Sequence, residues 1–122
     1  MILRVYDVEC TDVFVSWWSA LPEPHREAVT RGVDRLELYG TSLGHPYSSK
    51  LKASRHRRMR ELRILSSGRP FRVFYAFDSR RIALVLLGGD KTGDNRFYER
   101  LIPQADRLYD IHIATLGREG GG

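Results

Sequence analysis

Three cations and one tyrosine in the second half of the chain are the residues best suited to chemistry on a phosphate group. Arg63 lies in a segment of alternating apolar and polar residues, Arg72 lies in the next such segment, and Lys91 follows a third. Tyr98 lies near the start of a helical pattern. Neighbouring antiparallel strands hold side chains of one face about 5 Å apart, so these residues could converge. Arginine can hold the non-bridging oxygens of a phosphodiester in the transition state, and Lys, Tyr or His can move protons.

The positive charge of the chain is concentrated just before and within the first of these segments. Fourteen residues, Lys50 to Arg63, contain seven Lys or Arg and one acid, Glu61, so they contribute +6 to a formal net charge of +5. Such a concentration predicts a polyanionic partner, most often a nucleic acid. The candidate RNA-binding or ribosome-binding residues are Lys50, Lys52, Arg55, His56, Arg57, Arg58 and Arg60. A Lys/Arg run is also commonly a solvated face, so binding without catalysis stays open on residue chemistry alone.

Several other chemistries lack the residues that they need. A lone Cys10 excludes an internal disulfide and a cysteine-built zinc site. The four histidines show no metal-ligand spacing, and Gly88-Gly89 lacks the further glycine and the Lys-Ser/Thr pair of a phosphate loop. Asp90 and Asp94 flank a lysine and do not make a convincing magnesium site. We therefore expect no metal and no cofactor.

The size of the chain predicts one domain. It has 122 residues, of which 42% are hydrophobic, which suffices for one core. We expect a single domain over residues 1–117 and a frayed, glycine-rich tail over residues 118–122. The N-terminus lacks the pattern of a secretory signal, and the longest apolar run, residues 82–87, is too short to cross a bilayer. These features predict a cytoplasmic protein with no membrane partner.

The N-terminal part predicts a strand and a helical hairpin. Residues 2–9 are rich in β-branched and aromatic types, which favour a strand. Thr11 or Asp12 offers an N-cap for a short helix, whose two tryptophans lie on its apolar stripe and should pack in the core. A second helix is expected between Pro22 and Gly40, because proline favours a helix start and glycine a helix C-cap.

The following part predicts three antiparallel strands. After a turn-rich connector, a period of two begins at Met59 and predicts a half-buried strand with Glu61 and Arg63 on its polar face. A Ser-Ser-Gly turn leads to a second strand over residues 71–77. The wholly apolar run at residues 82–87 suits an inner strand that is covered on both faces.

A final helix completes the sequence of elements. Asp94 is a good N-cap for it, and Pro103 should kink the helix or restart it, because the proline nitrogen cannot donate a hydrogen bond. The order is β-α-α-β-β-β-α. It predicts an α+β fold with a mainly antiparallel sheet, an N-terminal helical hairpin and a C-terminal helix.

The stretch from Met59 to Asp110 carries the motifs MRELRI, GRPFRVFYAFD and LLGGDKTGDNRFYERLIPQADRLYD. It resembles the phage-derived Gp49-like, HigB-type branch of the RelE/ParE superfamily, the toxins of bacterial type II toxin-antitoxin systems. GGDKTGD followed by a tyrosine-bearing helix is the most specific part. The resemblance implies a RelE-like fold and a ribosome-dependent endoribonuclease, or mRNA interferase. Such an enzyme inhibits translation by metal-independent attack of the 2′-OH on the scissile phosphate, which leaves a 2′,3′-cyclic phosphate.

The resemblance also implies roles for single residues. Arg72 matches the phosphate-stabilising arginine of the family, and Arg63 matches its basic residue on the preceding strand. Lys91 matches the basic residue after the glycines, and Tyr98 matches the tyrosine of the last helix. Glu61 stands where RelE has a second lysine, so proton transfer would pass to another residue. The candidates for that transfer are Lys50, Lys52 and His56.

The partners that the resemblance implies are a helix-turn-helix, HigA-like antitoxin, messenger RNA and the ribosome. Operator DNA would be bound only through the toxin-antitoxin complex. Two other functions stay open. A ParE-like toxin would poison DNA gyrase without cutting RNA. A non-catalytic RNA-binding or ribosome-binding module would bind in a salt-sensitive way without toxicity.

Overall fold

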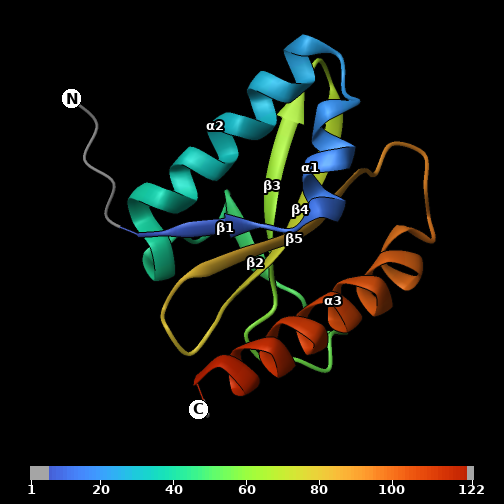
Figure 1. Ribbon diagram of the computed structural model, residues 1–122. Helices are drawn as coiled ribbons and strands as arrows, with labels where there is room; N and C mark the ends of the chain where they lie inside the picture. Colours follow the sequence, from blue (N-terminus) through green and yellow to red (C-terminus); the bar gives the residue numbers. More distant parts are fainter. Residues whose placement is uncertain (1–5, 121–122) are drawn as a thin grey trace.

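A five-stranded sheet with helices on both faces forms the fold (Figure 1). The computed structural model describes residues 6–120. Its elements are β1 (Val8–Cys10), α1 (Asp12–Ser19), α2 (Glu23–Tyr39), the 3-10 helix η1 (Gly40–Ser42), β2 (Ser48–Lys50), β3 (Arg60–Ser66), β4 (Arg69–Phe77), β5 (Ala83–Asp90) and α3 (Phe97–Gly120). The predicted α+β class is confirmed, and β2 is an additional strand within the expected connector. Of the strand predicted over residues 2–9, residues 2–5 lie outside the described part.

The strands are ordered β1-β5-β4-β3-β2 across the sheet. All neighbours are antiparallel except β1 and β5, which are parallel. The expected meander of three consecutive strands is confirmed as β3, β4 and β5. β5 lies inside the sheet and is covered on both faces, with Val85 in one hydrophobic layer and Leu84 and Leu86 in the other, which explains its uninterrupted apolar sequence.

The two faces of the sheet carry separate hydrophobic layers. Figure 1 shows α1 and α2 on one face and α3 on the other. Phe71, Val73 and Tyr75 of β4 pack in the layer with α1 and α2. Phe74 and Ala76 pack in the layer with α3. Because side chains alternate along a strand, β4 supplies both layers and is buried on both sides.

Local signals mark the start of α1, the end of α2 and the first hairpin, as the sequence predicts. The Thr11 hydroxyl accepts a hydrogen bond from the Phe14 amide at 3.1 Å and caps α1. Gly40 ends α2 with a φ of 54°, a conformation that favours glycine. Ser67 and Gly68 form the two-residue turn between β3 and β4 with φ values of 50° and 77°, which match the twist of a hairpin.

α3 begins close to its predicted cap and continues past its proline. The Asp94 carboxylate accepts a hydrogen bond from the Arg96 amide at 3.1 Å, just before the helix. Pro103 lies inside one continuous helix, so of the two outcomes predicted for it, a kink or a restart, the restart does not occur. The neighbouring Ile102 and Ala105 are buried against the sheet, and this packing offsets the missing hydrogen bond. The helix extends to Gly120, within the segment for which fraying is expected.

Two glycines of β5 allow helices to approach the sheet from both sides. A Cβ atom on Gly88 would lie 2.4 Å from a ring carbon of Trp17 in α1. A Cβ atom on Gly89 would lie 2.8 Å from a ring carbon of Phe97 in α3. Gly89 therefore sets how close the start of α3 comes to the end of β5, where the candidate site lies, and Gly88 does the same for α1.

Candidate active site

The four residues expected to do chemistry lie on one face of the sheet, at the N-terminal end of α3. Arg63 and Arg72 are direct cross-strand partners in β3 and β4. Lys91 follows β5, and its ammonium nitrogen lies 5.3 Å from the centre of the Tyr98 ring. The Tyr98 ring stacks nearly parallel to that of Phe74, with ring centres 6.1 Å apart. The structure thus brings the predicted site residues together.

A buried carboxylate lies at the centre of this group. Glu61 is 5% exposed, although the sequence places it on the polar face of a half-buried strand. Its Oε1 accepts a hydrogen bond from the Tyr98 hydroxyl at 2.7 Å. Its Oε2 accepts one from the Ser49 hydroxyl of β2 at 3.0 Å. Glu61 therefore joins the edge strand, the central strands and α3.

Arg72 is the counter-charge of Glu61, and it is also buried, at 7% exposure. Its Nε lies 3.4 Å from Glu61 Oε1 but is not aligned for a hydrogen bond, and within residues 6–120 it has no other hydrogen-bond partner. Its Nη1 donates to the Phe71 carbonyl at 3.0 Å. The guanidinium is thus held in place with one donor unsatisfied. A small pocket of about 230 Å³ borders both Arg72 and the exposed Arg63.

The environment of Tyr98 favours its protonated form. Partial burial raises the pKa of the Tyr98 phenol, and so does its hydrogen bond to Glu61. The phenol is therefore a hydrogen-bond donor at neutral pH. This state fits a role in fixing Glu61 and Lys91 rather than a role in accepting a proton.

The structure does not bring the whole basic segment to this site. Lys50 pairs with Arg60, which pairs with Tyr75 in the layer of α1 and α2. Directly opposed residues share a face, so Lys50 and Arg60 lie on the side of the sheet opposite to Arg63 and Arg72. Lys50 was one of three candidates for proton transfer, and this position on the opposite face does not fit that role.

Other residues of the segment are fixed on α3, far along the helix from Tyr98. His56 donates a hydrogen bond from Nε2 to the Asp110 carboxylate at 2.7 Å and packs edge-on against Tyr109, so it is only partly exposed. Arg55 forms an ion pair with Asp110, and Ser54 donates a hydrogen bond to Asp106. His56 is thus engaged away from the site. Lys52, Arg57 and Arg58 are exposed in the loop between β2 and β3.

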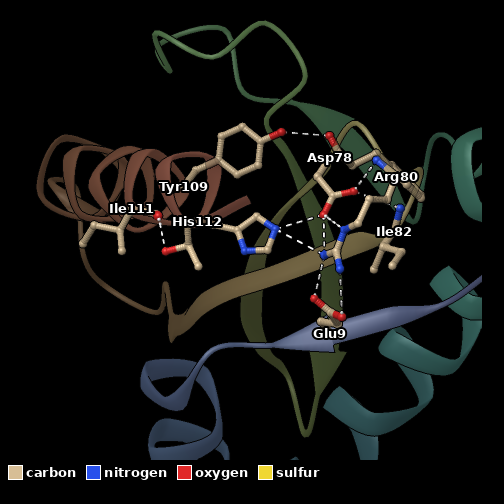
Figure 2. A network of polar contacts seen from close by, with 9 residues as sticks. Glu9, Asp78, Arg80, Ile82, Tyr109, Ile111 and His112 are labelled. Carbon is tan, nitrogen blue, oxygen red and sulfur yellow. Dashed lines mark hydrogen bonds and ion pairs between the residues drawn. The ribbon is translucent and has the colours of Figure 1, made fainter. Parts of the chain in front are cut away.

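Figure 2 shows a second polar network, around Asp78, which the sequence analysis did not predict. Asp78, at the end of β4, accepts hydrogen bonds from Arg80 at 2.7 Å and from His112 of α3 at 2.9 Å. Arg80 also donates to Glu9 of β1 at 2.8 Å. The network ties together three elements that are distant in sequence. The only local signal for it was an aspartate followed by two arginines in a turn.

Residues 6–118, whose side chains the structure describes, include no group of three or more His, Cys, Asp or Glu side chains that could bind a metal ion. They also include no helix with the length and apolar character needed to cross a membrane.

Comparison with known proteins identifies the family of the chain. Residues 16–110 match the family described as "Phage derived protein Gp49-like (DUF891)". The chain belongs to the Gp49-like family. It is similar to two Mycobacterium tuberculosis proteins of strain ATCC 25618 / H37Rv. The first, "Putative toxin HigB3", is 39% identical over 87% of this chain and 90% of that protein. The second, "Putative toxin HigB2", is 36% identical over 81% of this chain and 50% of that protein.

Solved structures place this Gp49-like chain in the RelE fold. RelE in the intact E. coli RelBE toxin-antitoxin complex matches with a TM-score of 0.55 at 15% identity, over 70% of this chain and 95% of that chain. The archaeal RelE-RelB complex from Pyrococcus horikoshii OT3 matches with a TM-score of 0.53 at 19% identity, over 72% and 97%. With the relatives above, these matches make the chain a HigB-type, RelE-like toxin.

Proposed function

We propose that this toxin is a metal-independent, ribosome-dependent endoribonuclease, an mRNA interferase that inhibits translation. The observation that carries the proposal is the paired Arg63 and Arg72 on one sheet face, with Arg72 held rigidly and incompletely satisfied by hydrogen bonds. Two guanidinium groups, one buried and held in place and one exposed beside it, are suited to the charge that develops on a phosphate during cleavage. Family membership and the similarity to HigB proteins support the same conclusion.

The reaction needs no metal, because RNA carries its own nucleophile. The 2′-OH gives up its proton, and the 2′-oxygen forms a bond to phosphorus as the bond from phosphorus to the 5′-oxygen breaks. The departing 5′-oxygen takes up a proton, and a 2′,3′-cyclic phosphate remains. Arg63 and Arg72 stabilise the non-bridging oxygens of the transition state, and Lys91 supplies a third cation beside Tyr98.

In this proposal Glu61 is a positioning residue. It fixes the Tyr98 hydroxyl by a hydrogen bond and holds the Arg72 guanidinium by charge. A rigid arginine loses less side-chain freedom when it meets the phosphate, and preorganised charges make larger contributions to transition-state stabilisation. Tyr98 in turn holds Lys91 over its ring.

The proposal includes a neutralising partner. The two RelE structures cited above are complexes with RelB, one of them described as a toxin-antitoxin complex. We expect this toxin likewise to bind an antitoxin, of the helix-turn-helix, HigA-like kind, and to reach operator DNA only within that complex.

The test is expression of the toxin without an antitoxin, followed by primer extension on cellular transcripts. Cuts in phase with codons, present only during translation, are expected. Arg63→Ala should reduce cleavage by ~100-fold, because it removes one transition-state contact. Arg63 is exposed, so the variant should fold. Arg72→Ala is less informative, since it would leave Glu61 buried without its counter-charge.

The matched control is Arg31→Ala, which removes an exposed arginine of α2 far from this face. It should cleave like the unmodified toxin. Intact transcripts together with a DNA-damage response would instead identify a gyrase-inhibiting toxin. Salt-sensitive RNA binding without cleavage or growth arrest would identify a non-catalytic module.

A further inference from the structure

A cluster of arginines lines a pocket on the sheet face opposite to the candidate active site. The pocket has a volume of about 670 Å³, and the four arginines that line it are Arg57, Arg58, Arg60 and Arg81. We call it the arginine pocket. Phe77 also lines it and belongs to the layer with α1 and α2, which places the pocket on that side of the sheet.

The positive charge of the arginine pocket is not neutralised by the side chains of residues 6–118, which are those that the structure describes. Asp78 is the one acid that lines it, and the network of Figure 2 occupies that carboxylate. Asp78 Oδ2 accepts from Arg80 and His112, and Oδ1 accepts from the Arg80 amide at 2.8 Å. Among residues 6–118, whose side chains the structure describes, none of the four arginines has a carboxylate within ion-pair distance, and Arg60 donates only to the Ser48 hydroxyl.

Arg81, which lines the pocket, has an unfavourable backbone conformation. Its φ is 66°, in the left-handed region that glycine and asparagine adopt far more readily than arginine. The turn is fixed there by a hydrogen bond from the Arg81 amide to the Asp78 carbonyl at 2.9 Å. Glycine would serve the turn better than arginine does. Strain of this kind often marks a position where the side chain has a function.

We propose that the arginine pocket binds phosphates of an RNA strand, at a second RNA site separate from the site of cleavage. The guanidinium fork matches phosphate oxygens, and four such groups suit a ligand with several negative charges. The volume accommodates a nucleotide rather than a single ion. Phe77 is the one apolar residue among those that line the pocket, and it is only 9% exposed, so we expect charge to dominate binding there. The choice of RNA rests on the proposed ribonuclease function.

The test measures binding of a short fluorescent oligoribonucleotide with 2′-O-methyl groups, which cannot be cleaved by 2′-OH attack. Arg81→Gly should weaken binding by about ten-fold and reduce the slope of log K against log salt by ~0.7, because one phosphate contact is lost. The variant should melt at no lower temperature than the unmodified protein, since glycine relieves the strained turn. Arg31→Gln, which removes the same charge from an exposed position of α2, should leave affinity unchanged.

Four results would overturn the inference. The first is an affinity of Arg81→Gly for the RNA probe equal to that of the unmodified protein. The second is a loss of affinity in Arg31→Gln as large as that in Arg81→Gly, which would indicate diffuse electrostatic attraction. The third is displacement of the RNA by millimolar inorganic phosphate, which would indicate a site for isolated anions. The fourth is stronger displacement by polyglutamate than by RNA of equal charge. The probe cannot be cleaved and the binding assay contains no ribosome, so binding is measured independently of cleavage. If the toxin binds the probe through this pocket but does not cut transcripts in cells, only the proposed function is contradicted.

Discussion

Glu61 is the residue for which the structure differs most from the interpretation of the sequence. Alternation in the sequence correctly places it on the same face as Arg63, but alternation carries no information on what covers that face. Its partners, Ser49 and Tyr98, come from a short edge strand and from the last helix. A carboxylate that seemed to interrupt a basic segment is therefore the buried counter-charge of Arg72.

Glu61→Gln is expected to destabilise the protein by about 3 kcal/mol, because it leaves the buried Arg72 without a counter-charge. It should also lower the pKa of Tyr98, since the negative charge near the phenol disappears. Urea unfolding measures the first effect. A pH titration of tyrosine absorbance, compared with that of Tyr98→Phe, measures the second.

Ser49→Ala is the matched control, because it removes a hydrogen bond to the same carboxylate without changing charge. It should lower the free energy of unfolding by about 1 kcal/mol and should lower the pKa of Tyr98 only slightly. If Glu61→Gln unfolds at the same urea concentration as Ser49→Ala, the Glu61–Arg72 pair does not hold the site together as described.

At the scale of elements, the glycine pair of β5 shows how a sequence motif positions a site. Gly88→Ala should destabilise the protein by about 1–3 kcal/mol, because the added methyl group would overlap the rigid ring of Trp17. Gly44→Ala is the control, since nothing lies within 4 Å of the position of its Cβ. Thermal unfolding of both variants distinguishes them. Equal melting temperatures would mean that α1 can move away from β5 at little cost.

Elements with local signals could be predicted from the sequence, and elements without them could not. The cap at Thr11 and the turn at Ser67 depend on residues within one turn of the chain, so their types suffice. β2 consists of Ser48, Ser49 and Lys50, and only its pairing with β3 makes it a strand. The continuity of α3 through Pro103 likewise depends on packing against the sheet.

At the scale of the whole molecule, the basic segment is divided between surfaces that the sequence cannot distinguish. Arg63 faces the candidate active site, and Arg60 lines the arginine pocket on the opposite side of the sheet. Arg55 is paired with acids of α3. Charge counts locate the segment, whereas strand register and tertiary ion pairs decide what each cation does.

The Asp78 network holds β1, the β4–β5 turn and α3 together, so it should govern stability in acid (Figure 2). Burial acts to raise the pKa of Asp78, but hydrogen bonds from Arg80 and His112 lower it to about 2. Because the unfolded value is about 4, the contribution is complete above that pH and is lost as the pH falls toward the folded value.

Between about pH 4 and pH 2, the free energy of unfolding should therefore decrease less in Asp78→Asn than in the unmodified protein. The two decreases should differ by roughly 2 kcal/mol. Urea unfolding at a series of pH values measures the difference. Parallel stability curves for the two proteins would show that Asp78 is not the group responsible.

The two strands at the margins of the sheet, β1 and β2, have three residues each, whereas β3, β4 and β5 have 7, 9 and 8. Both short strands carry a charged residue, Glu9 in one and Lys50 in the other. Long, uncharged margins would offer backbone groups as a template for strands of other molecules. This toxin presents little such template, so the folded chain resists aggregation by strand addition even while no partner covers it.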